Sequence, residues 1–309
     1  MKYISIITDN NYAPHTGALI FSISKSNPTL NCKYFILGHS FTLDTINKFH
    51  ELSTSINREI EIIPIYPTSI PHFSVYRRYS FLIYVKLYLS YLLPQTVDWV
   101  LNLDVDTIVN GSLEYIFNYP NKEKYALLAA EDYDGCNEYK LMSGLEIKDN
   151  YYNAGVCYFN LTYWRIHHLS EECTKFINHN KHIASVLEQG ALSYVCKDVA
   201  QALPIKYNVL AGYYFYKPKV QSKYQTELSS ALKEPIIIHY AEPIKPWHRN
   251  CFHPLKKLYI NSIKQTPWKN IHFKINANRK ILHMINMYIQ YLLHNLGIRK
   301  INSFYQKIN

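Results

Sequence analysis

The first 65 residues alternate between short apolar runs and longer segments of helical character. Residues 3–7, 33–37 and 59–65 are typical of buried strands, and residues 17–26 and 43–52 of the helices between them. Helical connections of this kind join parallel strands. The pattern predicts an α/β chain that begins like the nucleotide-binding half of a doubly wound sheet. No Gly-x-Gly-x-x-Gly follows the first strand, so the dinucleotide fingerprint is absent.

The remaining segments continue this alternation and extend the expected sheet. Further strands are expected at residues 99–103, 125–130, 204–207 and 235–239, and a turn that becomes a strand at residues 151–160. Helices are expected at residues 78–93, 170–178 and 183–195. The 309 residues suffice for one large domain with an appendage.

The apolar run at residues 99–103 ends in two acids separated by one residue, Asp104-Val105-Asp106. If the strand continued, both carboxylates would point to the same side. They would then repel each other unless a cation joined them. Open α/β sheets bind ligands at the carboxyl ends of their strands. The pair predicts a divalent metal that holds a phosphorylated ligand, and the alternative is two solvated acids that begin a loop.

A histidine closes the last apolar run as these acids close the earlier one. His239 ends the expected strand at residues 235–239. Two carboxylates and an imidazole suit Mn²⁺, which accepts oxygen and nitrogen donors. A single histidine at a strand end is more often structural, so its neighbourhood decides between the two interpretations.

Several short motifs occur in a fixed order along the chain. They are Asp9-Asn10-Asn11-Tyr12, Asp104-Val105-Asp106, Asn153-Ala154-Gly155, Glu188-Gln189, and His239 followed by Lys245-Pro246-Trp247. Each motif alone is weak, but the ordered set, which covers roughly residues 1–253, is specific. It resembles the retaining glycosyltransferases of family 8, especially the bacterial galactosyl- and glucosyltransferases that extend lipooligosaccharide.

This resemblance implies a GT-A fold, which is a Rossmann-like mixed sheet with helices on both faces. It also implies a UDP-hexose donor and a Mn²⁺ cofactor, with Mg²⁺ as the alternative. The metal ligands would be Asp104, Asp106 and His239. The other residues of the nucleotide-binding set would be Asp9, Asn11, Tyr12, Lys86, Val105 and Lys245. Tyr12 would stack on uracil, and Lys245 would contact the diphosphate as a point charge.

The resemblance places a second group of residues around the donor sugar. These residues are Asp132, Asn153, Glu188 and Gln189, with Glu131 or Asp134 of the same acidic loop as alternatives to Asp132. An amide oxygen is weakly basic, so Gln189 is expected to stabilise an oxocarbenium-like state rather than to act as a nucleophile. Front-face attack by the acceptor would then retain the configuration of the sugar.

Three positions depart from the family pattern. Lys86 replaces the usual arginine and loses its bidentate geometry. Glu242 replaces a glycine near the phosphates, and Gly190 replaces the second acid of Asp-Gln-Asp. These departures keep open a degenerate member that binds a UDP-sugar without turnover. A sugar nucleotidyltransferase is another alternative, although that class usually has a Gly-rich basic loop after the first strand.

The net charge of +10 lies entirely in the C-terminal part of the chain. From Pro243 onward there are 12 Lys and Arg residues and no acids, whereas the preceding part has a net charge of −2. Apolar residues at helical spacing in the tail share one face: Leu282, Ile285, Ile289, Leu292, Leu293 and Leu296. This pattern favours an in-plane helix on anionic lipid, and packing on the core is the alternative.

The predicted organisation is a catalytic domain at residues 1–260 and a basic membrane-associating helical tail at residues 261–309. The nucleotide-sugar half would end near residue 110, and the acceptor half would follow. The six cysteines lack close spacing, and neither a signal-peptide pattern nor a transmembrane run is present. We therefore expect a bacterial cytoplasmic enzyme, peripheral on the inner face of the membrane. Its acceptor would be a glycolipid or oligosaccharide, and no motif indicates nucleic acid.

Overall fold

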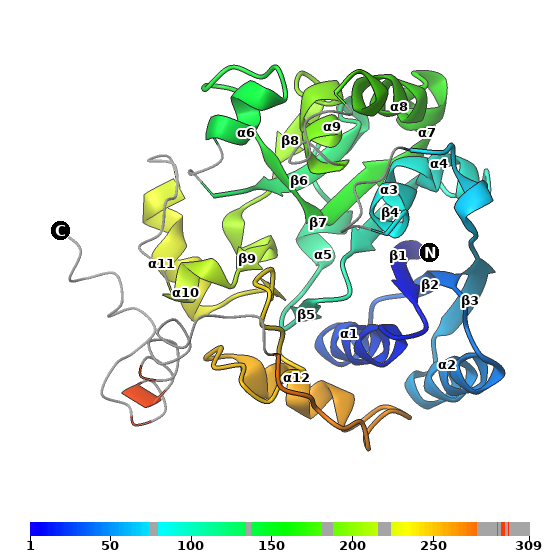
Figure 1. The fold of residues 1–309 in the computed structure, drawn as a ribbon, viewed down its shortest axis with the longest axis vertical. Helices are drawn as coiled ribbons and strands as arrows, with labels where there is room; N and C mark the ends of the chain where they lie inside the picture. Colours follow the sequence, from blue (N-terminus) through cyan, green and yellow to red (C-terminus); the bar gives the residue numbers. More distant parts are fainter. Residues whose placement is uncertain are drawn as a thin grey trace.

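A seven-stranded sheet forms the centre of the molecule (Figure 1). The structure is a computed structural model that describes residues 1–73, 80–133, 137–180, 188–215, 224–276, 289, 292, 293 and 296. The strands of the sheet are β1 (Lys2–Asp9), β2 (Cys32–His39), β3 (Glu59–Pro64), β4 (Trp99–Leu103), β6 (Leu127–Glu131), β7 (Tyr152–Asn160) and β8 (Ala200–Ala202). Their order is β3-β2-β1-β4-β7-β6-β8. Strand β7 runs antiparallel to both of its neighbours, whereas the other adjacent pairs are parallel.

A second, three-stranded sheet lies beside the end of β4. It contains β5 (Thr107–Val109), β9 (Val209–Leu210) and β10 (Ile237–His239), in the order β5-β10-β9. Strand β10 pairs antiparallel with β5 and parallel with β9. In this register His239 lies opposite Thr107, directly after the acidic pair. A pairing between distant parts of the chain therefore brings the histidine to the acids.

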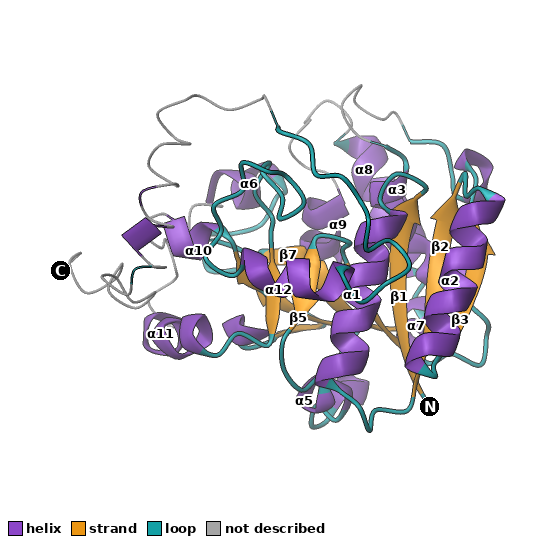
Figure 2. Ribbon diagram, turned by 90° about the horizontal axis from the view of Figure 1, so that it is seen from below, coloured by secondary structure: helices purple, strands orange, loops and turns teal. Residues whose placement is uncertain are grey.

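Helices cover both faces of the main sheet (Figures 1 and 2). One layer contains α1 (Ala13–Ser26), α2 (Leu43–Ile56) and α12 (Lys256–Ile263), and the other contains α7 (Leu161–Ile166), α8 (Leu169–His179) and α9 (Glu188–Val195). The short helices α5 (Glu114–Phe117), α6 (Asn137–Met142), α10 (Gly212–Phe215) and α11 (Gln225–Lys233) lie in the connections. Leu101 and Leu103 pack with the first layer and Val100 with the second, as strand alternation requires. The predicted α/β class with a mixed sheet is confirmed.

Two predicted elements are wrong. The expected helix at residues 78–93 is broken, in its described part, into α3 (Leu82–Val85), a 3₁₀ turn at Lys86–Tyr88 and α4 (Leu89–Leu92). The turn lies where the buried Lys86 side chain bonds to the acidic pair, so tertiary contacts override helix periodicity. The expected strand at residues 204–207 is a 3₁₀ turn at Ile205–Tyr207, preceded by Pro204.

Residues just beyond the predicted catalytic domain pack on its core. Helix α12 continues across residue 260, and Trp268 packs edge-on against Phe49 of α2, with ring centroids 4.9 Å apart. Residues 261–276 therefore share the packing of the domain. Most of the tail, including Leu282 and Ile285, lies outside the described residues. Among the described residues, no helix combines the length and apolar character needed to span a bilayer.

Candidate active site

The two acids lie on a turn between the two sheets rather than on an extended strand. Asp104 follows β4 and Asp106 precedes β5, and the backbone N–H of Thr107 donates to the Asp104 carbonyl at 3.1 Å. The prediction that strand alternation aligns the two side chains is therefore wrong, because the turn, and not a continued strand, brings Asp104 and Asp106 together. One ligand atom each from Asp104, Asp106 and His239 lies within 4.8 Å of the others. The side chain of Val105 instead packs against the hydrophobic core.

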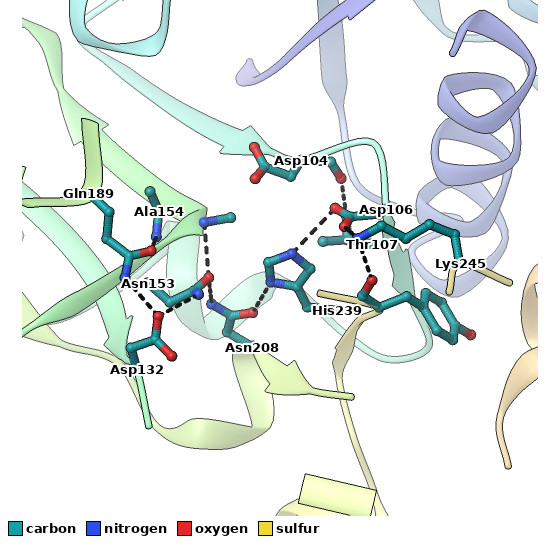
Figure 3. A network of polar contacts seen from close by, with 12 residues as sticks. Asp104, Asp106, Thr107, Asp132, Asn153, Ala154, Gln189, Asn208, His239 and Lys245 are labelled. Atoms are coloured by element: carbon teal, nitrogen blue, oxygen red, sulfur yellow. Dashed lines mark hydrogen bonds and ion pairs between the residues drawn. The ribbon is translucent and has the colours of Figure 1, made fainter. Parts of the chain in front are cut away.

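His239 is buried and is held on both sides of its ring (Figure 3). Its Nε2 lies 3.3 Å from Oδ1 of Asp106, and its Nδ1 lies 3.0 Å from Oδ1 of Asn208. The ring also lies against Gly155 of β7, where a Cβ would come within 2.2 Å of the imidazole. The imidazole therefore has a fixed orientation toward the acids.

Each acid of the pair is joined to a lysine. Lys86 Nζ donates to Asp104 Oδ1 at 2.9 Å and to the Ala154 carbonyl at 2.8 Å. Lys245 Nζ donates to Asp106 Oδ2 at 2.6 Å and to the Tyr240 carbonyl at 2.8 Å. Both predicted lysines thus lie at the acidic pair, although Lys86 is almost fully buried and Lys245 is partly exposed.

These charges control the protonation of the buried groups. Burial alone would raise the pKa of Asp106, but the charge of Lys245 and the interaction with the His239 ring outweigh it and hold this pKa well below its usual value. Burial opposes the charged form of Lys86, yet Asp104 and Glu188 raise its pKa above the ordinary lysine value. Asp106 is therefore a carboxylate, and Lys86 is an ammonium, at neutral pH.

Three of the four residues predicted around the donor sugar form one hydrogen-bonded group (Figure 3). Asp132 Oδ2 accepts from the side-chain amides of Asn153 at 3.0 Å and Gln189 at 2.7 Å. Gln189 Oε1 accepts from the backbone N–H of Ala154 at 3.2 Å. Asp132 follows β6, and Asn153 lies near the start of the antiparallel β7, so both reach the same edge of the sheet.

The structure also places Glu188, from the predicted sugar-binding set, and Glu242, which departs from the family pattern. Glu188 begins α9, and its burial, partly offset by Lys86, raises its pKa. Glu242 follows β10 and lies within electrostatic reach of Tyr133. Burial, together with the charges of Tyr213, Asp132 and Glu242, raises the Tyr133 pKa. The negative charge of Glu242 is therefore felt by the Tyr133 hydroxyl group.

The first loop is closed by its own aspartate. Asp9 Oδ1 accepts from the backbone N–H groups of Asn11 at 2.8 Å and Tyr12 at 3.0 Å, directly before α1. Tyr12 is 44% exposed, and its ring stands edge-on to Trp247. Trp247 is buried and stacks on His15, with ring centroids 3.8 Å apart, so its role is in packing. The loop and the Lys245-Pro246-Trp247 segment are therefore fixed to each other.

The buried ring of His15 predicts an acid-sensitive step in stability. Burial, and less so the charge of His248, lowers the His15 pKa to about 3. The unfolded chain takes up this proton near pH 6.5 and the folded chain does not, so stability is lost as pH falls below about 6.5. Between pH 7.5 and 5, the wild type should lose about 2 kcal/mol more than His15→Gln in urea unfolding.

His50→Gln serves as the control, because His50 lies exposed on α2. This variant should keep the wild-type dependence on pH. A His15→Gln protein that lost stability as steeply as the wild type would contradict the neutral buried ring.

Asn208 is the residue of this network that sequence reasoning missed. It is buried between His239 and Asn153, to which its Nδ2 donates at 2.8 Å. It directly precedes β9, and the pairing of β9 with β10 places it beside the histidine. No local motif marks it, because its position depends on a strand pairing across about thirty residues.

Comparisons with known proteins agree with this arrangement. The sequence profile described as glycosyl transferase family 8 matches residues 3–251. The lipopolysaccharide 1,2-glucosyltransferase of Escherichia coli (strain K12) is 24% identical over 265 residues, which are 85% of this chain and 77% of that protein. A putative glycosyltransferase of Haemophilus influenzae is 26% identical, over 80% of this chain and 73% of its own.

The fold has a counterpart among solved structures. The galactosyltransferase LgtC, solved in complex with donor and acceptor sugar analogues, superposes with a TM-score of 0.75 at 21% identity. The match covers 86% of this chain and 96% of that one. This agreement shows the GT-A fold, and the profile match spans most of the sequence. The chain belongs to glycosyl transferase family 8.

Proposed function

We propose that this protein transfers a hexose, glucose or galactose, from a UDP-sugar to a lipopolysaccharide or lipooligosaccharide glycan with retention of configuration. The observation that carries the proposal is the cluster of Asp104, Asp106 and His239, with Lys245 at its edge. Of the proteins named above, the Escherichia coli relative is a lipopolysaccharide 1,2-glucosyltransferase by name and LgtC is a galactosyltransferase by name, which supports this substrate class.

The donor set fits a divalent metal. Two carboxylates and a neutral imidazole match Mn²⁺ better than Mg²⁺, which prefers oxygen ligands alone. When bound, the ion would supply Lewis-acid stabilisation of the charge on the departing diphosphate. Lys245, whose ammonium already lies at the metal-ligand edge, would pair with that diphosphate. We assign uracil stacking to Tyr12 and the base and ribose contacts to Asp9 and Asn11.

The residues on the other side of the site would hold the sugar. Asp132 and Asn153 are placed to bind its hydroxyl groups, and the Glu188 carboxyl lies buried near Lys86. The Gln189 oxygen already accepts from a backbone N–H, which makes it a weak nucleophile. We propose that it stabilises positive charge at the anomeric carbon while the acceptor hydroxyl attacks from the front face. A phosphate oxygen of the donor would take the acceptor's proton.

The decisive experiment measures UDP release with Mn²⁺ across a panel of UDP-sugars and lipooligosaccharide acceptors. We expect release with UDP-glucose or UDP-galactose, and EDTA should reduce the rate to background. Tight UDP binding without release from any donor would instead indicate a degenerate member. Pyrophosphate release from UTP and a sugar phosphate would indicate a nucleotidyltransferase.

We further propose peripheral attachment to the cytoplasmic face of a bacterial membrane through the tail. The basic character of the segment after Pro243 supports this proposal, as do Ile289 and Leu296, which are 47% and 67% exposed. Because Trp268 packs in the core, the tail is best deleted after residue 276. The shortened protein should no longer sediment together with anionic vesicles, but it should still hydrolyse the donor. Persistent vesicle binding would contradict this role of the tail.

A further inference from the structure

Two buried side-chain amides connect strand β7 to the imidazole of the metal cluster (Figure 3). Asn153 Oδ1 accepts from the backbone N–H of Gly155 at 3.0 Å and from Asn208 Nδ2 at 2.8 Å. Asn208 Oδ1 lies 3.0 Å from His239 Nδ1. The exposed fractions of Asn153, Asn208 and His239 are 7%, 1% and 5%. Because these three side chains are so deeply buried, they depend on one another for their hydrogen bonds.

The direction of each hydrogen bond in this series, from Gly155 to His239, follows from the first donor, the Gly155 N–H. A backbone N–H can only donate, so Asn153 must present its oxygen to Gly155. Asn208 must then present its NH₂ group to that oxygen and its own oxygen to His239. A carbonyl oxygen can only accept, so the proton of the neutral imidazole lies on Nδ1.

The NH₂ end of the Asn153 amide independently indicates the same orientation of this side chain. Asn153 Nδ2 faces Oδ2 of Asp132 at 3.0 Å, and a carboxylate only accepts hydrogen bonds. Reversing the Asn153 amide would place oxygen against carboxylate and NH₂ against the backbone N–H. Two fixed partners therefore set the orientation of the amide that sets Asn208.

We propose that Asn208 is a positioning residue that keeps the His239 proton on Nδ1, so that Nε2 presents its lone pair to Asp104 and Asp106. The inference rests on the proposed metal site and adds to it a residue outside the predicted ligand set. Without the Asn208 oxygen, a proton on Nε2 would donate to Asp106 Oδ1, which lies 3.3 Å away. That tautomer would cover the nitrogen that a metal requires.

The surrounding backbone holds the His239 ring in place on both sides. Strand β10 pairs His239 with Leu210 of β9, which fixes the distance from the ring to Asn208. Gly155 closes the other side, where a Cβ would lie 2.7 Å from Nδ1. Selection between the two tautomers therefore falls to the partner of Nδ1 rather than to a rotation of the ring.

The test replaces Asn208 with leucine, which is close in size and accepts no hydrogen bond. Proton–nitrogen NMR of the protein with ¹⁵N-labelled histidine, without metal and at pH 8, reports which ring nitrogen carries the proton. We expect His239 to change from the Nδ1–H form in the wild type to the Nε2–H form in Asn208→Leu. Mn²⁺ titration followed by electron paramagnetic resonance should show affinity reduced about 10- to 100-fold.

Two controls separate this effect from general loss of packing. Asn160→Leu removes another buried side-chain amide, which caps α7 by accepting from the Tyr163 N–H. It should destabilise the fold but leave the His239 tautomer and the Mn²⁺ affinity unchanged. His248 is an internal reference, because its Nδ1 accepts from the backbone N–H of Lys245 and its proton therefore lies on Nε2. Its spectrum should not change in either variant.

Two results would overturn the role of Asn208. One is an Nε2–H form of His239 in the wild type, and the other is an unchanged tautomer and Mn²⁺ affinity in Asn208→Leu. A wild type that binds no Mn²⁺ but shows the Nδ1–H form would contradict the proposed metal site. The tautomer shift in Asn208→Leu would still decide whether Asn208 controls the ring, so the two failures are distinguishable.

Discussion

Asp106→Asn is expected to weaken Mn²⁺ binding at least about 100-fold and to lower kcat by about 10²- to 10³-fold. The wild-type carboxylate lies 3.3 Å from His239 Nε2 and 2.6 Å from Lys245 Nζ. The amide removes the charge that these groups and the metal share. It also offers an NH₂ group that cannot bind a metal. Electron paramagnetic resonance of Mn²⁺ and steady-state UDP release measure the two effects.

Asp44→Asn provides the matched control for this charge change. Asp44 lies exposed on α2, where it pairs only with Lys48 at 2.7 Å among the ion pairs of the described residues. The control should bind Mn²⁺ and release UDP at wild-type levels. If Asp106→Asn did the same, the acidic pair would not be the metal site.

Gly155→Ala is expected to damage the site by steric overlap. The added methyl group would lie 2.2 Å from Cε1 and 3.0 Å from Nε2 of His239, so the ring or β7 must move. Overpacking of this kind typically costs about 1–3 kcal/mol. We expect that loss in urea unfolding, together with Mn²⁺ affinity reduced at least about tenfold, because Nε2 leaves its position opposite the acids.

Gly17→Ala is the control that separates the effect of overpacking from the displacement of the His239 ring. Its methyl group would lie 2.7 Å from the Trp268 ring, in the layer of α1 and α12. This variant should lose stability but keep Mn²⁺ affinity. Equal metal affinities in Gly155→Ala and the wild type would show that the His239 ring is not a ligand.

The first half of the fold was predictable because short apolar strands alternate with longer helical segments along the sequence. The expected strands at residues 3–7, 33–37 and 59–65 correspond to β1, β2 and β3, and the expected helices to α1 and α2. Each strand is a short apolar run, and each helix has its own periodicity. The metal cluster was also predictable, since its residues end apolar runs.

Other features depended on contacts that no local pattern records. A regular helix was expected around Lys86, but its ammonium is held between a carboxylate and a backbone carbonyl. A turn was expected at the start of residues 151–160, yet β7 already begins at Tyr152, and both of its faces are buried. Asn208 joins the site only after β9 pairs with β10. In each case a distant partner determines the conformation or the role of the residue.

The reversed direction of β7 has a consequence for how much the site must reorganise when a donor arrives. An antiparallel strand begins where its parallel neighbours end, so Asn153, Ala154 and Gly155 enter the site on the backbone of β7, where its register with β6 shifts. Their N–H groups orient Gln189 and Asn153 before any ligand binds. Dipoles fixed in this way need not turn as charge separates between sugar and phosphate, which lowers the reorganisation energy of the transfer.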